Sequence, residues 1–119
     1  MAEAVLDRSF REPLDDEARA GFLGWAAAVS QQAAYDVLAS QRDLDLTGEL
    51  AGVRQPAIVI HGRYDRARPP EQGRELAGSL PNAEFRLVET GHTPLYEAPA
   101  AVAAAVRDVL VPRPDGVPR

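Results

Sequence analysis

The sequence predicts an α/β fold with about two parallel strands, flanking helices and further helices before them. Residues 57–99 read in order as strand, loop, helix, strand, loop and helix start, and both strands are short apolar runs. Because strands joined through a helix are parallel and the crossover is right-handed, this order predicts two adjacent parallel strands. At 119 residues the chain has room for about one domain.

The first part of the chain, residues 1–45, is predicted to be helical. Residues 1–14 fit a short helix and a loosely packed arm equally well. Asp15 and Asp16 have the residue types of a helix N-cap and first turn, and apolar residues then recur at the spacing of one helical face. A second helix is predicted over residues 31–40.

Two pairs of residues in this part have both a structural and a functional interpretation. Trp25 and Tyr35 either pack in a core between the two helices, the more ordinary outcome, or line a pocket for an apolar substrate. Asp43 and Asp45 are either a metal site or acids of a solvated loop with a capping role. Two acids at i and i+2 without further oxygen ligands favour the loop.

The second part, residues 46–110, carries the strands. Residues 57–61 are apolar and rich in β-branched residues, which is typical of a buried strand. The elements that follow are a helix from Pro70, a strand over residues 84–88 and a helix from Pro99. The predicted buried side of the first helix consists of Leu76, Ala77 and Leu80. Residues 111–119, with three prolines and a glycine, are predicted to be disordered or extended.

Asp65 and His92 each follow one of the two strands. Reactive and ligand-binding groups of open α/β sheets gather at the carboxyl ends of the strands. A carboxylate can orient a histidine and stabilise its imidazolium, and histidine is the usual general base near neutral pH. The alternative for Asp65 is a turn residue paired with a neighbouring arginine, at position 63, 66 or 68. The pair is more informative than either residue, because adjacent parallel strands would bring both to one edge.

The motifs around these two residues resemble the C-terminal portion of the α/β-hydrolase family. The G-R-Y-D run ending at Asp65 resembles the acid loop of that family, and G-H-T-P-L-Y-E-A-P around His92 resembles its histidine loop. The resemblance implies a partial α/β-hydrolase fold, with residues 1–45 as cap-like helices and residues 46–110 as the last strand–helix–strand–helix unit. It also implies that Asp65 is the triad acid and His92 the triad base.

The nucleophile of this family lies in a G-x-S-x-G elbow before the acid, and the chain has no such elbow. None of its four serines has glycine two positions away on both sides: Ser9, Ser30, Ser40 and Ser79. The family's early oxyanion-hole loop is also missing; His61-Gly62 only superficially resembles one. We therefore expect a truncated, serine-hydrolase-like chain that is inactive alone. A complete enzyme would hydrolyse a small apolar ester or a related acyl substrate.

Two other functions are considered. The chain could be a non-catalytic interaction domain or split subunit, which pairs through its exposed sheet edge with a partner chain or with a second copy. A small nucleotide- or metal-binding α/β protein ranks last, because no glycine-rich phosphate loop follows a strand and His61, Asp65 and His92 form a weak ligand set.

The composition argues against several partners. The net charge is −5, and the basic residues, all arginine, are scattered among acids, so no nucleic-acid partner is expected. The absence of cysteine excludes disulfides, thiolate metal sites and a cysteine nucleophile. We expect no cofactor and no metal. No apolar run is long enough to span a membrane and no secretory segment is recognised, so the expected location is the cytoplasm.

Overall fold

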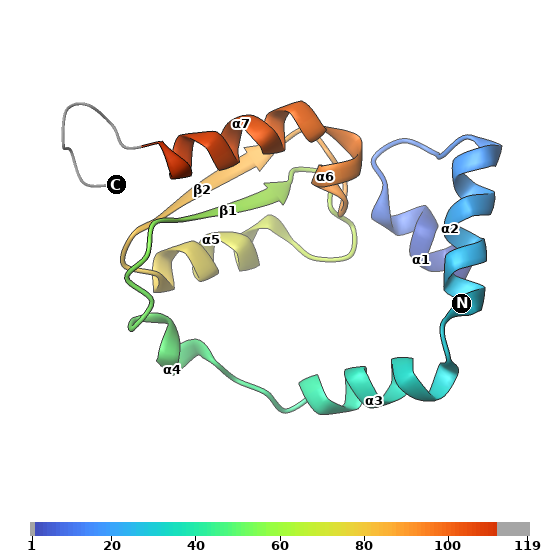
Figure 1. The fold of residues 1–119 in the computed structure, drawn as a ribbon, viewed down its shortest axis with the longest axis horizontal. Coiled ribbons are helices and arrows are strands. Elements are labelled where there is room, and N and C mark those ends of the chain that lie inside the picture. The colour runs from blue at the N-terminus through green and yellow to red at the C-terminus, as the bar shows by residue number, and fades with distance from the viewer. Residues whose placement is uncertain (1, 112–119) are drawn as a thin grey trace.

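The computed structural model describes residues 2–111 and contains helices around a two-stranded parallel sheet (Figure 1). The elements in chain order are α1 (Ala2–Ser9), α2 (Asp16–Ala28), α3 (Gln31–Gln41), α4 (Thr47–Leu50), β1 (Ala57–Gly62), α5 (Pro70–Ser79), β2 (Ala83–Val88), α6 (Pro94–Glu97) and α7 (Pro99–Leu110). The predicted disordered tail, residues 111–119, lies outside the described residues except for Val111. No helix of residues 2–111 is long and apolar enough to cross a membrane.

The two strands pair in parallel along their whole length. Their register runs from Ala57 opposite Ala83 to Gly62 opposite Val88. Helix α5 provides the crossover between them, and α5 and α7 lie on opposite faces of the sheet (Figure 1). The predicted partial α/β fold with two parallel strands is therefore confirmed.

The helices approach the sheet through small residues. The buried residues of α5 are Gly73 and Ala77, whereas Leu76 is 43% exposed, so its predicted place on the buried side is wrong. A Cβ atom on Gly73 would lie only 2.9 Å from the Phe85 ring, because the helix backbone rests directly on the side chains of the sheet. In α7 the fully buried residue is likewise small, Ala105.

The first part of the chain is helical, and its beginning packs tightly. Residues 2–9 form a helix, so the short helix and not the loosely packed arm is the correct alternative for this stretch. Asp15 caps α2 by accepting a 2.7 Å hydrogen bond from the Ala18 amide. Phe10, between α1 and α2, is only 4% exposed, and its ring centroid is 5.3 Å from that of Phe22. An aromatic contact therefore joins this segment to α2.

The core-packing interpretation of Trp25 and Tyr35 is wrong. Their side chains are 70% and 66% exposed, and α3 lies apart from the sheet (Figure 1). The preferred interpretation of the loop acids holds: an Asp45 carboxylate oxygen accepts the Thr47 amide at 2.9 Å, and Asp43 pairs with Arg42 at 3.2 Å. Among residues 2–111 no group of three or more acids or histidines is placed to hold a metal ion.

Candidate active site

Asp65 and His92 lie together at the carboxyl ends of the two strands. Because β1 and β2 are parallel and in register, the loops that follow them begin at the same sheet edge. The distance from His92 Nδ1 to Asp65 Oδ2 is 2.8 Å. The Asp65 side chain is 3% exposed and the His92 side chain 47%, so a buried acid supports an imidazole that solvent and ligands can reach.

The Asp65 carboxylate is held by its own loop. Its Oδ1 atom accepts hydrogen bonds from the backbone amides of Ala67, at 2.8 Å, and Arg68, at 2.9 Å. Burial opposes ionisation of this carboxyl group, but the hydrogen bonds from His92 and from the two amides outweigh it and hold the pKa of Asp65 below its usual range. Asp65 is therefore a carboxylate with a fixed orientation at neutral pH.

This geometry assigns the proton positions of His92. A carboxylate only accepts hydrogen bonds, so Nδ1, which faces Asp65 Oδ2, carries the hydrogen in the neutral ring. The Nε2 atom is then the unprotonated nitrogen. A histidine in this tautomer, oriented by a buried carboxylate, can take a proton from a hydroxyl group and return it later.

His61 also contacts Asp65, which the sequence did not predict. Its Nε2 atom lies 3.3 Å from Asp65 Oδ2 and 3.1 Å from the Arg68 carbonyl oxygen. The Arg68 carbonyl oxygen can only accept, so this nitrogen carries a hydrogen and donates to it. The available signal was the position of His61 at the end of a strand, four residues before the acid. Asp65 Oδ2 thus lies between two imidazole rings.

The arginines of the acid loop do not neutralise Asp65. Arg63 pairs with Glu89 at 2.5 Å, and the Arg68 side chain donates to the Ala67 carbonyl oxygen at 2.9 Å. The basic side chains within 4 Å of the Asp65 carboxylate, among the described residues, are His61 and His92. The alternative interpretation, in which Asp65 is a turn residue paired with a neighbouring arginine side chain, is therefore wrong.

The two loops meet backbone to backbone, which requires glycine. A Cβ atom on Gly62 would overlap the carbonyl oxygen of Gly91. A Cβ atom on Gly91 would come within 2.7 Å of both the Ser9 carbonyl oxygen and the Arg11 amide nitrogen. Three chain segments therefore converge beside His92, and side chains at these two positions would separate them.

Glu97 fastens the N-terminal segment to the histidine loop, a role that the sequence did not reveal. Its Oε1 atom accepts the Gly91 amide at 2.9 Å, and its Oε2 atom accepts the Arg11 amide at 2.8 Å. The amide of His92 donates to the Ser9 carbonyl oxygen at 2.7 Å. The loop that carries the candidate base is consequently fixed to a segment more than 80 residues earlier.

The serine hydroxyl groups are engaged elsewhere. The hydroxyl of Ser9, which is nearest in the chain to this contact, donates to the Val5 carbonyl oxygen at 2.7 Å. Ser30 caps α3, and the hydroxyls of Ser40 and Ser79 donate to backbone carbonyls in their own helices. Within residues 2–111 no serine hydroxyl is hydrogen-bonded to His92.

A cavity of about 670 Å³ adjoins His92. Its walls come from α2 and from the histidine loop, and they are mostly apolar. The lining residues are Glu17, Ala18, Gly21, Phe22, Trp25, His92, Thr93, Pro94, Leu95 and Tyr96. Trp25 thus lines a pocket, the alternative to core packing, whereas Tyr35 is not among the residues that line this cavity.

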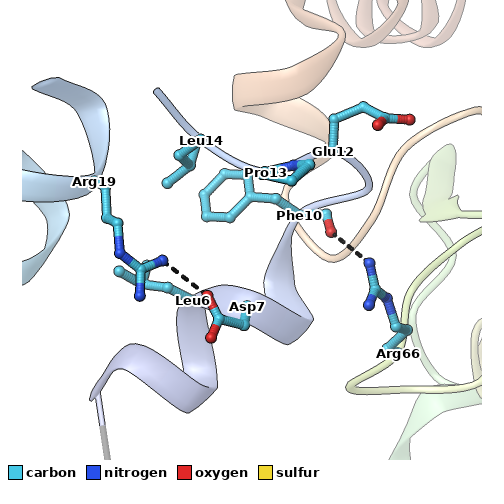
Figure 2. Close-up of a pocket in the computed structure, with 8 residues that line it drawn as sticks. All are labelled: Leu6, Asp7, Phe10, Glu12, Pro13, Leu14, Arg19 and Arg66. Atoms are coloured by element: carbon cyan, nitrogen blue, oxygen red, sulfur yellow. Dashed lines mark hydrogen bonds and ion pairs between the residues drawn. The ribbon is translucent and has the colours of Figure 1, made fainter. Parts of the chain in front are cut away.

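A smaller cavity of about 200 Å³ lies where the N-terminal segment turns between α1 and α2 (Figure 2). Arg19 pairs with Asp7 across it at 2.8 Å, and the Arg66 guanidinium points toward the Phe10 carbonyl oxygen at 3.4 Å (Figure 2). This cavity contains neither Asp65 nor His92. Its polar contacts join the N-terminal segment to the acid loop, which supports a structural role.

Comparisons with known proteins agree on the α/β-hydrolase fold. No protein-family model matches the sequence. The chain is 30% identical over 89 residues to the AB hydrolase superfamily protein YisY of Bacillus subtilis (strain 168), which covers 74% of this chain and 33% of that protein. It is 34% identical over 73 residues to a proline iminopeptidase of Neisseria gonorrhoeae, covering 59% of this chain and 23% of the relative. The chain therefore spans a third or less of the length of these curated relatives.

Two solved structures match most of the described fold. The enol-lactonase from Burkholderia xenovorans LB400 superposes with a TM-score of 0.74 and 29% identity, over 92% of this chain and 43% of that one. The esterase EaEST from Exiguobacterium antarcticum has a TM-score of 0.81, over 92% of this chain and 42% of its own, and its 18% identity makes it a likeness of fold alone.

Proposed function

This chain has a partial α/β-hydrolase fold, and we propose that it supplies the acid and the base of an acyl-hydrolysing triad whose nucleophile comes from outside the chain. The complete enzyme would hydrolyse a small apolar ester or a related acyl substrate. The observation that supports this best is the 2.8 Å contact between His92 Nδ1 and Asp65 Oδ2 beside an apolar cavity. In this proposal residues 1–45 act as a cap-like segment over the unit formed by residues 46–110.

The proposed chemistry follows from the proton positions. A serine hydroxyl placed near His92 Nε2 would attack the acyl carbon while the imidazole takes its proton. Asp65 stays ionised throughout and stabilises the imidazolium that forms. The imidazolium then protonates the leaving alcohol, and a water molecule releases the acyl group by the same proton path. Because the chain has no G-x-S-x-G elbow and no serine hydroxyl of residues 2–111 is hydrogen-bonded to His92, the isolated chain is proposed to have negligible hydrolase activity.

Assaying the purified chain with p-nitrophenyl acetate tests the inactivity. The expected rate equals that of buffer, with or without the substitution His92→Ala. Turnover that is abolished by His92→Ala would contradict the proposed inactivity, because it would mean that this chain has a nucleophile of its own.

Reconstitution tests the roles of the acid and the base. The chain is mixed with a partner chain that contains a G-x-S-x-G elbow, and ester hydrolysis should appear. Asp65→Asn should then lower kcat by roughly 10³–10⁴, whereas Glu75→Gln, on the exposed side of α5, should not. A restored enzyme that tolerates Asp65→Asn would show that Asp65 is not the acid. Sequencing the DNA upstream of Met1 shows whether the elbow is encoded in the same frame.

A second candidate function is a non-catalytic interaction domain. It is favoured by one observation: each strand has a single neighbour among residues 2–111, so the outer edges of both β1 and β2 lack a strand partner there. Unpaired edges are templates for strand addition by a partner chain or by a second copy. Sedimentation velocity separates the possibilities, since a well-folded monomer over a range of concentrations would contradict self-association.

A further inference from the structure

The cavity beside His92 is lined by three aromatic rings that meet edge to face. The Phe22 ring centroid is 5.3 Å from that of Trp25, at an interplanar angle of 83°, and 5.3 Å from that of Tyr96, at 73°. Edge-to-face pairs at this separation are favourable and fix the mutual orientation of the rings. The Trp25 side chain is nevertheless 70% exposed. Part of the aromatic cluster therefore remains open to a ligand, and a flat apolar group would pack against it.

Gly21 leaves the room for such a group. It lines the cavity, and a Cβ atom built on it meets nothing within 4 Å apart from its chain neighbours and the backbone of its own helix. A larger side chain at this position would extend into empty space in the cavity without colliding with the protein. Gly24, one helical turn later, is equally free of neighbours but does not line the cavity. The two glycines thus form a matched pair, of which one controls the cavity size.

Glu17 gives the same cavity a charge preference. It is exposed, it lines the wall, and it forms no ion pair with any described residue. No lysine or arginine lines this cavity, so a carboxylate ligand would meet no permanently positive side chain there. An anion beside Glu17 would be repelled, because like charges a few ångströms apart at a partly exposed site destabilise each other.

We infer that this cavity binds an uncharged, ring-sized apolar group, that Gly21 determines the size it accepts and that Glu17 discriminates against carboxylates. The inference deepens the proposed function and rests on it in one respect: the group would be the apolar part of the ester held beside His92. Binding itself needs no nucleophile. A chain that binds the ring but gives no turnover even when reconstituted with a partner that contains the G-x-S-x-G elbow would uphold this inference and contradict the proposed function.

The test uses Trp25, the one tryptophan of the chain, as the reporter. Its indole N–H gives a single signal in an ¹H–¹⁵N spectrum, and the purified chain is titrated with methyl benzoate and, separately, with benzoate. Methyl benzoate should shift the signal in a saturable way. Benzoate, which differs by a negative charge, should bind about three- to tenfold more weakly.

Two pairs of variants decide the roles of the residues. Gly21→Leu should weaken methyl benzoate binding by about tenfold or more, and Gly24→Leu should leave it unchanged. Glu17→Gln should bring benzoate to the affinity of the ester, and Asp16→Asn, on the same helical turn but outside the cavity lining, should not. Equal effects of the two leucine variants would overturn the role of Gly21. No saturable shift with methyl benzoate would overturn the whole inference.

Discussion

Replacing Glu97 by glutamine should loosen the contact between the N-terminal segment and the histidine loop. The carboxylate accepts three hydrogen bonds: from the Gly91 amide at 2.9 Å, from the Thr93 hydroxyl at 2.9 Å and from the Arg11 amide at 2.8 Å. In glutamine an NH₂ group replaces one oxygen, so at least one donor then faces another donor. A hydrogen bond to a charged group contributes about 1.5–3 kcal/mol. Since Glu97 is only half-buried, solvent screening lowers the expected loss to about 1–3 kcal/mol.

Urea denaturation of Glu97→Gln measures this loss against the control Glu75→Gln. Glu75 lies on α5, is exposed and forms no ion pair with the described residues, so its variant should stay within about 0.5 kcal/mol of the parent chain. Hydrogen exchange gives a local readout, because the amides of Arg11 and Gly91 should exchange faster in Glu97→Gln only. Equal unfolding midpoints for the two variants, together with unchanged exchange rates at these two amides, would refute this role of Glu97.

Three further outcomes follow from the same structure. The pKa of Asp65 is held below its usual range, so the stability that its ionised form contributes is complete above about pH 4 and is lost as the pH falls through the folded pKa. As the pH is lowered, the unfolding midpoint should therefore fall less steeply for Asp65→Asn than for the parent chain. The control Asp16→Asn should show the same pH dependence as the parent. Gly91→Ala puts a Cβ atom within 2.8 Å of three backbone atoms and should cost about 1–3 kcal/mol in urea denaturation, whereas Gly78→Ala, in open space on α5, should stabilise by about 0.5–1 kcal/mol. Phe10→Ala should lower the melting temperature, at a cost of about 3 kcal/mol, because its ring is buried against two other rings; a change below about 0.5 kcal/mol would contradict that packing.

The strand pairing and the meeting of Asp65 with His92 could be predicted because local signals and one topological rule suffice. Each strand is marked by its own apolar run, and the intervening helix forces a parallel crossover. Residues directly after the two strands must then share one sheet edge. The distance of 2.8 Å adds precision to a proximity that follows from chain order alone.

The contacts of the N-terminal segment could not be predicted, because their partners lie far away in the chain. Arg11 and Glu97 are 86 positions apart, and neither stands in a pattern that identifies the other. The error on Leu76 has a related cause. Periodicity finds the apolar residues of a helix, but the side that meets the sheet is chosen by close backbone approach, which favours Gly73 and Ala77.

These unforeseen contacts determine what stands beside His92. The cavity takes its walls from α2 and from the histidine loop, which are joined through Phe10 and through the bonds of Glu97. If that junction loosened, Phe22 and Trp25 would no longer be held against the loop, even though the bond between His92 and Asp65 would remain. Gly21→Leu fills the cavity and leaves the junction intact, whereas Glu97→Gln weakens the junction and leaves the cavity unfilled. Because both should weaken methyl benzoate binding, but only the second should speed amide exchange at Arg11, the pair separates the shape of the cavity from the stability of the frame that holds it.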